Sequence, residues 1–276
     1  MGNVMKLMIF VAIIALGLYV YARYIEPECL ILQEEMIYTE RLNCTEPLRV
    51  VQCSDLHLGP DYDMAHLERI VNKINALDAD ILVFTGDLVD DNRSFTDVQI
   101  TKELLSSLNA KYGKYAIMGN HDYGWKGPRL YYEIIKASGF QLLINESVAI
   151  NIDKKNKLNI IGVDDIIFGE PDIHKAMKKV GENDYNILLC HEPDVAEKFQ
   201  DYPIDLQLSG HSHGGQVSIP FIGAPFTTKY GHKYIRGMYQ MPDNPRMQLY
   251  VNIGIGTSQK RYRFGCMPEL TVFTLN

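Results

Sequence analysis

Five short apolar runs in this chain each end in residues that can bind a metal ion or move a proton. Their ends are Asp55-Leu56-His57, Gly86-Asp87, Gly119-Asn120-His121-Asp122, His191-Glu192 and Gly210-His211-Ser212-His213. Apolar runs of this length between turn-forming residues are typical of buried β-strands. Because ligands in α/β folds gather at the carboxyl ends of strands, we expect these polar side chains to meet at one edge of a sheet.

The segments between these runs favour an α/β fold. Residues 64–77 carry apolar side chains at helical spacing, and residues 96–108 and 131–138 are further predicted helices. Strands are expected at residues 30–42, 47–53, 79–85, 115–118, 147–152, 158–163, 186–190, 206–209, 248–253 and 270–275. Alternating strands and helices favour parallel strands that are covered by helices.

The candidate metal ligands offer oxygen or imidazole nitrogen, and none of them is a thiolate. They are Asp55, His57, Asp87, Asn120, His191, His211 and His213. One such residue alone is equally well explained as a turn former or an ordinary polar side chain. Together they indicate a site for divalent metals such as Mn²⁺, Fe, Co²⁺ or Zn²⁺, and they are too many for one tetrahedral ion. Two ions that share a carboxylate fit them better.

The spacing of these ligands predicts the direction in which their side chains project. Asp55 and His57 are two positions apart, as are His211 and His213. Alternate residues of a strand share a face, so we expect each pair to project to the same side. Glycines beside the pairs let the backbone approach the metals and turn away.

The ordered motifs D-x-H, G-D-x-x-D, G-N-H-D, H and G-H-x-H resemble those of the calcineurin-like metallophosphoesterase superfamily, from about residue 48 to the C-terminus. The stretches GHSHGGQVSIPFIGAP, KYGHKYIRGMY and GIGTS resemble more narrowly its membrane-associated bacterial phosphodiesterases. The resemblance implies a four-layer α/β/β/α sandwich of two mixed sheets, preceded here by an N-terminal transmembrane helix. It also implies a dinuclear metal centre between the sheet edges.

The resemblance assigns roles to individual residues. One ion would be held by Asp55, His57 and His213, the other by Asn120, His191 and His211, and Asp87 would bridge the two. His121 would be the general acid that protonates the leaving oxygen, with Asp122 orienting its ring. A pure metal-binding scaffold would not need His121. Asp90 stands near a position where some members carry a phosphate-binding arginine, so similarity to the protein serine/threonine phosphatases is in doubt.

These residues predict a hydrolase acting on ester bonds, a metallophosphoesterase of the phosphodiesterase type. Two divalent ions, manganese among the candidates, would activate the attacking water and neutralise charge on the phosphoryl oxygens. We expect phosphodiester or pyrophosphate bonds to be favoured over monoesters, with lipid-linked esters among the substrates. The alternatives are a pyrophosphohydrolase of the UDP-2,3-diacylglucosamine type and, from another class, a non-catalytic metal-binding membrane protein. The net charge of −7 disfavours nucleic acid as a partner.

Residues 4–23 are predicted to anchor the chain in a membrane. The run LMIFVAIIALGLYVYA between Lys6 and Arg23 carries no charge, and Lys6 can extend its ammonium group to the interface. A cleaved signal peptide would need small residues after the run, where the bulky residues 19–21 stand instead. We therefore expect a single-pass protein of the cell membrane with its main domain on the extracytoplasmic side.

The remaining chain divides into two expected parts. Residues 24–47 are predicted to form a linker and the first strands, and residues 48–276 the metallophosphoesterase domain. The five cysteines are odd in number and form no C-x-x-C pair, so they indicate neither a zinc ribbon nor a disulfide scaffold.

Two apolar features near the predicted site have more than one interpretation. The loop IPFIGAPFTTKY at residues 219–230 either packs in the core or forms an apolar wall that admits an acyl chain or dips into a bilayer. The sequence leaves open whether residues 221–226 contact lipid. Trp125, four residues after His121, either stacks on a substrate or caps the core.

Overall fold

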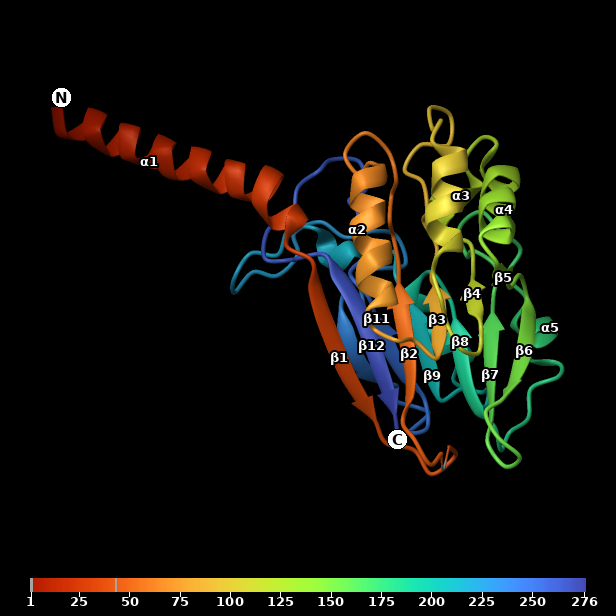
Figure 1. The fold of residues 1–276 in the computed structure, drawn as a ribbon. Helices are drawn as coiled ribbons and strands as arrows, with labels where there is room; N and C mark the ends of the chain where they lie inside the picture. Colours follow the sequence, from red (N-terminus) through yellow and green to blue (C-terminus); the bar gives the residue numbers. More distant parts are fainter. Residues whose placement is uncertain (1, 43) are drawn as a thin grey trace.

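Two six-stranded sheets lie face to face and form the centre of the molecule (Figure 1). Residues 2–42 and 44–276 are described by the structure, a computed structural model. The first sheet contains, in spatial order, β1 (Ile31–Ile37), β12 (Glu269–Leu275), β2 (Leu48–Cys53), β3 (Ile81–Phe84), β4 (Lys114–Ala116) and β5 (Phe140–Leu142). The second contains β10 (Gly237–Gln240), β11 (Gln248–Val251), β9 (Leu206–Ser209), β8 (Tyr185–Leu189), β7 (Lys157–Gly162) and β6 (Glu146–Asn151).

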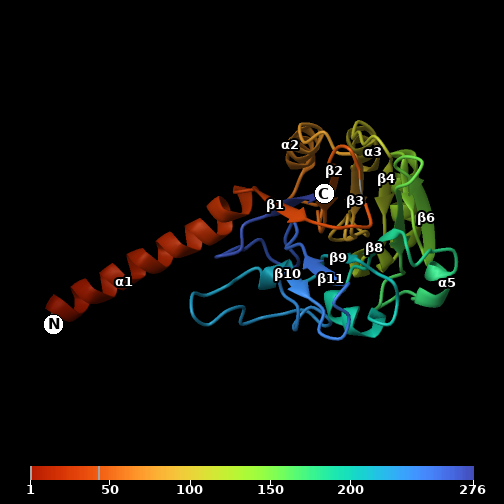
Figure 2. The same ribbon diagram turned by 90° about the horizontal axis from the view of Figure 1, so that it is seen from below.

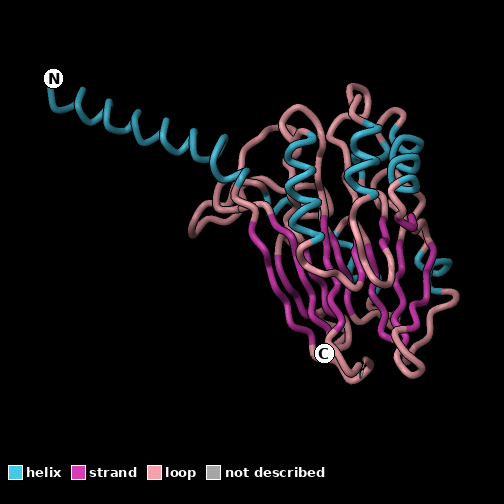
Figure 3. The backbone as a smooth tube through the Cα atoms, in the orientation of Figure 1, coloured by secondary structure: helices cyan, strands magenta, loops and turns pink. Residues whose placement is uncertain are grey.

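Both sheets are mixed, as expected. Strands β2 to β5 run parallel to one another, and β12 pairs antiparallel with β2. In the second sheet β7, β8, β9 and β11 are parallel, with β6 and β10 antiparallel at the edges. The parallel strands of each sheet therefore bring their carboxyl ends to one edge, where the loops follow (Figure 3).

Side chains of β2 show how the layers are built. Val50 packs between the two sheets, whereas Val51 faces the helices on the outside. Successive residues of a strand point to opposite faces, so a strand with adjacent apolar residues such as these can be buried on both sides. The outer face is covered by α2 (Met64–Asn75), α3 (Val98–Ser106) and α4 (Gly127–Ala137).

The second sheet carries its own outer layer. Short helix α5 (Ile173–Met177) and the 3₁₀ turns of Pro193–Phe199 pack against its outer face through Met177, Val195 and Phe199. Figure 2 shows these elements on the side of the molecule away from α2 and α3. The four-layer α/β/β/α sandwich is thereby confirmed.

The N-terminal helix α1 (Gly2–Val20) leaves the sandwich and buries none of its residues. It continues through a π-helical turn, Tyr21–Ile25, and a 3₁₀ turn, Glu26–Glu28. The segment Gly2–Glu28 is long and apolar enough, by length and composition, to cross a membrane. The chain then enters β1, which pairs in parallel with β12 at the edge of the first sheet.

Three short elements were not expected from the sequence. They are β5, α5 and β10. Each is five residues long or shorter, so no period can be recognised in it and pairing with a neighbouring strand or sheet decides its conformation. Helix α4 also begins earlier than predicted, at Gly127, with Pro128 in its first turn.

Candidate metal centre

The predicted ligands lie where the carboxyl ends of the two sheets meet. The first sheet contributes Asp55 and His57 after β2, Asp87 after β3 and Asn120 after β4. The second sheet contributes His191 after β8, and His211 and His213 after β9. All except Asn120 are buried. The structure thus brings together residues that are far apart in the sequence.

The backbone at these ligands is left-handed. Asp55 and His57 have φ of 51° and 45°, His211 and His213 have φ of 67° and 50°, and Asp87 has 59°. The residues of each pair converge, but not because they continue a strand as we expected: the strands have already ended, and tight turns aim the side chains. Such a conformation costs a non-glycine residue about 1–3 kcal/mol, and strain of this kind clusters at functional sites.

Asp55, His57 and His213 form a first cluster, in which one ligand atom of each lies within 4.8 Å of the others. The Nε2 atoms of His57 and His213 are 3.0 Å apart, and His213 Nε2 is 3.4 Å from Asp55 Oδ1. Two imidazole nitrogens that face each other so closely need a proton or a cation between them. A carboxylate with two imidazoles is a donor set suited to a divalent metal.

Asp87, His191 and His211 form a second cluster within the same distance limit. Asp87 Oδ2 lies 3.3 Å from His191 Nε2 and 3.5 Å from His57 Nε2. One carboxylate oxygen therefore faces both clusters, which is the arrangement that a carboxylate shared by two ions requires.

Hydrogen bonds to main-chain carbonyls fix the histidine rings of the second cluster. His191 Nδ1 donates to Thr85 O at 2.6 Å, and His211 Nε2 donates to Lys229 O at 2.8 Å. The proton on each of these nitrogens leaves a lone pair on the opposite nitrogen, which is how metal-binding histidines are oriented.

Two buried acceptors fit a bound cation. Asn120 Oδ1 and His191 Nε2 have no hydrogen-bond partner among the described residues. Buried polar atoms are rarely left unpaired. Gly119, directly before Asn120, lies against Asp87 and His191, which places Asn120 at the second cluster. The residues present thus match the donor chemistry of two divalent ions.

The ionisation of the carboxylates in the two clusters also supports a cation site. Burial alone would raise the pKa of Asp55, but the imidazoles of His213 and His57 outweigh burial and hold its pKa below the usual range. Burial is likewise outweighed at Asp87, where His191 lowers the pKa. Both carboxylates are therefore ionised at neutral pH, and their negative charge favours a divalent cation between the sheets.

Glycine is required at Gly210 by close approach. A Cβ atom there would overlap Ser54 Oγ and Asp55 Oδ2. Ser54 donates a hydrogen bond to Asp55, and the main-chain N–H of His211 donates to both oxygens of the same carboxylate at 3.1 Å. Gly210 therefore lets β9 approach β2 closely enough to fix Asp55.

His121 and Asp122 lie beside the clusters, and one expectation about them is wrong. Asp122 does not orient the ring of His121, because its two oxygens accept the main-chain N–H groups of Asp87, Leu88 and Gly119 at 2.8–3.0 Å. Burial, followed by the charge of Asp87, raises the pKa of Asp122 to about 7. Asp122 holds the loops after β3 and β4 together instead.

Asp90 is the residue that orients His121. The Nδ1 atom of His121 donates to Asp90 O at 2.9 Å and lies 3.7 Å from Asp90 Oδ1. Asp90 Oδ1 is also 3.3 Å from His57 Nδ1, and the three residues form a third cluster. The signal in the sequence is the second aspartate of the motif G-D-x-x-D.

Arg263 is a second residue that the sequence did not reveal. It is fully buried and donates to the carbonyl oxygens of Ile253, Gly254, Gly256 and Cys266 at 2.6–2.9 Å. Its acceptors are main-chain atoms, so no side-chain pattern marks them. The loop that it holds lies directly behind the first cluster, where a Cβ on Gly254 would meet the Cβ of Asp55 at 2.7 Å.

The two ambiguous apolar features are exposed. Phe221, Ile222 and Phe226 are exposed by 74% or more, so the interpretation that their loop packs in the core is wrong. Trp125 is 77% exposed and does not cap the core. Phe226 borders a cavity of about 160 Å³ that His213 also lines, so the loop lies at the open side of the centre.

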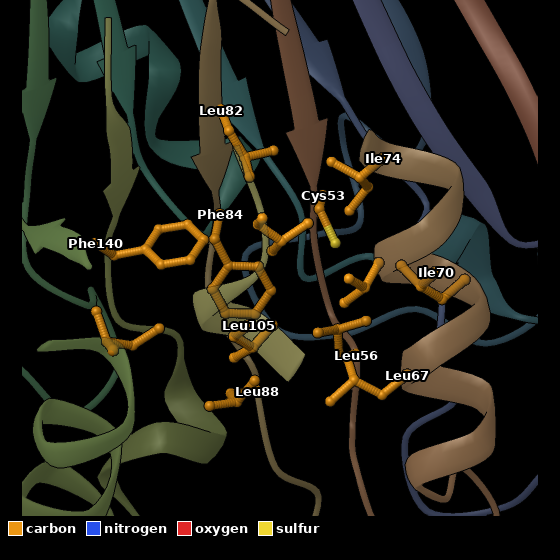
Figure 4. Close-up of a pocket in the computed structure, with 13 residues that line it drawn as sticks. Cys53, Leu56, Leu67, Ile70, Ile74, Leu82, Phe84, Leu88, Leu105 and Phe140 are labelled. Atoms are coloured by element: carbon orange, nitrogen blue, oxygen red, sulfur yellow. The ribbon is translucent and has the colours of Figure 1, made fainter. Parts of the chain in front are cut away.

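A second, purely apolar pocket lies behind the first sheet and is not part of this centre. Figure 4 shows Leu56, Leu67, Leu105 and their neighbours closing it beneath α2. Every residue that lines it is aliphatic, aromatic or cysteine. Without convergent polar groups it is a packing feature of the core, not a binding site.

A model of the calcineurin-like phosphoesterase family matches residues 48–215 of the chain. The metallophosphoesterase YkuE of Bacillus subtilis, called uncharacterized, is 38% identical over 96% of this chain and 92% of its own length. The UDP-2,3-diacylglucosamine pyrophosphatase LpxG of Chlamydia trachomatis is 31% identical over 91% of each chain. A dimetal phosphatase from Danio rerio has a TM-score of 0.44 and 11% identity, over 76% of this chain and 88% of that one.

Proposed function

The chain belongs to the calcineurin-like phosphoesterase family and is a hydrolase of phosphoester bonds, and we propose that it cleaves phosphodiester or pyrophosphate bonds with two metal ions. The observation that carries this proposal is the position of Asp87 Oδ2, 3.5 Å from His57 Nε2 and 3.3 Å from His191 Nε2. A shared carboxylate between two sets of imidazoles is the donor arrangement of a dinuclear centre.

Each of the two clusters would hold one ion. Asp55, His57 and His213 would hold the first ion, Asn120, His191 and His211 the second, and Asp87 both. Two divalent ions, when bound, lower the pKa of a water nucleophile and neutralise charge on the phosphoryl oxygens. Manganese, iron, zinc and cobalt all suit these donors.

His121 is proposed as the general acid. Its Nδ1 proton is held by Asp90 O, and its Nε2 has only a long contact, 3.5 Å, with Ser258 Oγ. The Oδ1 atom of Asp90 is 3.7 Å from the same Nδ1, so Asp90 positions the ring and Nε2 is the nitrogen that would deliver a proton to the leaving oxygen. A positioned acid of this kind contributes about 10²–10⁴-fold in rate.

The charges around the centre support a diester or pyrophosphate over a monoester. Among the described residues, no lysine or arginine forms an ion pair with any of the seven candidate ligands. Arg263, the buried arginine behind the first cluster, donates to main-chain carbonyl oxygens of the domain. A dianionic monoester would therefore rely mainly on the two ions for charge compensation, whereas a monoanionic diester needs less.

A more specific candidate is a pyrophosphatase of the UDP-2,3-diacylglucosamine type. It is favoured by the LpxG relatives of two Chlamydia species, at 31% and 30% identity over at least 91% of this chain. An acylated substrate would also suit the exposed Phe226 beside the cavity that His213 lines. Lipid-linked phosphate esters are therefore the substrates to test first.

The place of action is proposed to be a membrane. Helix α1 is apolar, unburied and continuous with the domain through Glu28. We propose a single-pass cell-membrane protein with its catalytic domain on the extracytoplasmic side, since Lys6 lies at the N-terminal end of the span and can remain inside.

Hydrolysis by the full chain in detergent tests the proposed function. We would compare Mn²⁺-dependent cleavage of bis-p-nitrophenyl phosphate and p-nitrophenyl phosphate by the wild type, Asp87→Ala and His121→Ala. His174→Ala is a matched control, because His174 hydrogen-bonds Tyr202 near α5, on the outer face of the second sheet. We expect diester cleavage to be lost in the first two variants and kept in the control.

Metal content separates the remaining possibilities. His121→Ala should keep about two ions per chain, because His121 is proposed to move a proton and not to bind metal. Preference for the monoester would overturn the substrate class. A folded chain that binds two ions and cleaves neither ester would be a non-catalytic metal-binding membrane protein.

A further inference from the structure

The loop that follows the metal-binding histidines exposes three large apolar side chains near its tip. Phe221 is fully exposed, and Ile222 and Phe226 are 74% and 78% exposed. Single exposed apolar residues are ordinary, but three within six positions of one loop indicate an interaction site. We call residues 219–226 the apolar loop.

The root of helix α1 is fixed to the domain and not joined through a flexible linker. Arg263 N donates to Ala22 O at 2.9 Å, and Arg23 forms an ion pair with Asp61 at 3.0 Å. The carboxylate of Glu26, 1% exposed, accepts the main-chain N–H groups of residues 265 and 266. The direction in which the span leaves the domain is therefore set by the fold.

The apolar loop begins at the same part of the domain that holds the root of α1. Its base pairs with the segment that holds α1: Ser218 N donates to Phe264 O at 2.7 Å. The ring of Phe264 contacts Tyr21 at 6.2 Å between centroids, and Tyr262 contacts Tyr19 at 5.9 Å. Aromatic residues at the end of an apolar span are typical of the membrane–water interface.

Two views agree on where the loop points. Figures 1 and 2 both show the light-blue loop between β9 and β10 projecting on the side of the domain from which α1 departs. A planar bilayer that contains α1 would thus lie against the side that carries the loop tip.

The loop is also tied to the metal centre. His211 Nε2 donates to Lys229 O, just beyond the loop, and Gln216 exchanges hydrogen bonds with Ser258 at its base. Phe226 and His213 line the same cavity. The position of the loop therefore fixes the height of the metal centre above the surface on which the loop rests.

We propose that the apolar loop inserts into the bilayer leaflet in which α1 ends, so that the metal centre opens at the level of the lipid head groups. Its partner is the lipid bilayer, because the loop is continuous with the interfacial aromatic residues at the end of the only apolar span among the described residues. The insertion itself does not depend on the proposed function. Its consequence for substrate access does rest on that function. Ester substrates carried by lipids would then reach the centre without leaving the membrane.

Depth-dependent quenching of tryptophan tests the insertion directly. Phe221→Trp is compared with Phe168→Trp, which replaces a phenylalanine that is 64% exposed in the loop before α5. Native Trp125 is present in all proteins, so the wild-type signal can be subtracted. The full chains are reconstituted in phosphatidylcholine–phosphatidylglycerol vesicles with or without lipids brominated on their acyl chains.

We expect the added emission of Phe221→Trp to be blue-shifted and quenched at least twofold by brominated lipid, and that of Phe168→Trp to be unaffected. Equal, water-like emission from both would overturn the proposal. A blue shift without quenching that grows with the protein-to-lipid ratio would identify a second copy of the chain as the partner, and would also overturn it.

Hydrolysis assays provide a second test, which distinguishes failure of the insertion from failure of the proposed function. Phe221→Ser/Ile222→Ser should lower hydrolysis of a diacyl phosphodiester in vesicles by about tenfold and leave bis-p-nitrophenyl phosphate cleavage unchanged. Equal loss on both substrates, or on neither, would contradict the role of the loop in substrate access. If the wild type cleaves no ester at all, the proposed function fails, while the quenching result still decides whether the loop inserts.

Discussion

Replacing Arg263 by methionine should destabilise the protein and weaken metal binding together. Arg263 donates to four buried carbonyl oxygens, at 2.6–2.9 Å. Leaving a buried acceptor unpaired costs about 1–3 kcal/mol, so four would cost about 4–12 kcal/mol in a rigid loop. Relaxation of the loop and relief from burying the guanidinium charge offset part of this cost, and we expect about 4 kcal/mol.

Thermal unfolding of the full chain in detergent measures this loss. A cost of about 4 kcal/mol corresponds to a fall in Tm of about 10 °C for a domain of this size. Because the loop lies against Asp55, the dissociation constant for Mn²⁺ should also rise, by about tenfold or more. The control is Arg69→Met, whose side chain is 56% exposed and pairs with Glu28. Such surface pairs contribute about 0–1 kcal/mol.

An Arg263→Met variant that melts within about 3 °C of the wild type, as the control should, would refute the reasoning. The four carbonyl oxygens would then find water or other donors readily. A lower Tm with unchanged Mn²⁺ affinity would support the structural role of Arg263 but contradict its influence on the metal centre.

Four further outcomes follow from the structure. Gly210→Ala should lose metal, measured by mass spectrometry, because a Cβ would overlap the Asp55 carboxylate. Asp122→Asn should lower the free energy of unfolding by about 1–3 kcal/mol, since one of three main-chain N–H donors would face an amide NH₂ group; an unchanged denaturation midpoint would contradict that. Asp90→Ala keeps the carbonyl that holds His121, so kcat should fall about tenfold or less, whereas His121→Ala should cost about 10²–10⁴-fold. Chelation with EDTA should lower the Tm of the wild type, because ionised buried carboxylates would face each other without a cation; equal melting with and without EDTA would argue against bound metal.

The sequence predicted the layers and the edge at which the site lies, because both depend on patterns within single segments. Strand β2 contains the adjacent β-branched residues Val50 and Val51, and their burial on opposite faces follows from the alternation of side chains along a strand. The candidate ligand residues stand directly after the predicted strands, so their place at the carboxyl ends could be inferred from chain order alone.

Features set by contacts between distant segments could not be predicted in this way. The left-handed turn at Asp55 is imposed by neighbouring strands, and no local pattern distinguishes it from a continuing strand. Asp122 follows His121 directly, yet its acceptors face main-chain N–H groups from another loop. The exposure of Phe221 could not be predicted either, because the sequence alone does not show whether an apolar loop residue packs in the core or lies on the surface.

The central claim is that one carboxylate, that of Asp87, joins two metal ions. Electron paramagnetic resonance of the full chain loaded with Mn²⁺ tests it most directly, because two ions bridged by a carboxylate couple their spins. We predict the spectrum of an exchange-coupled pair in the wild type and its loss in Asp87→Ala. A spectrum of isolated Mn²⁺ in the fully loaded wild type would contradict a dinuclear centre at this site.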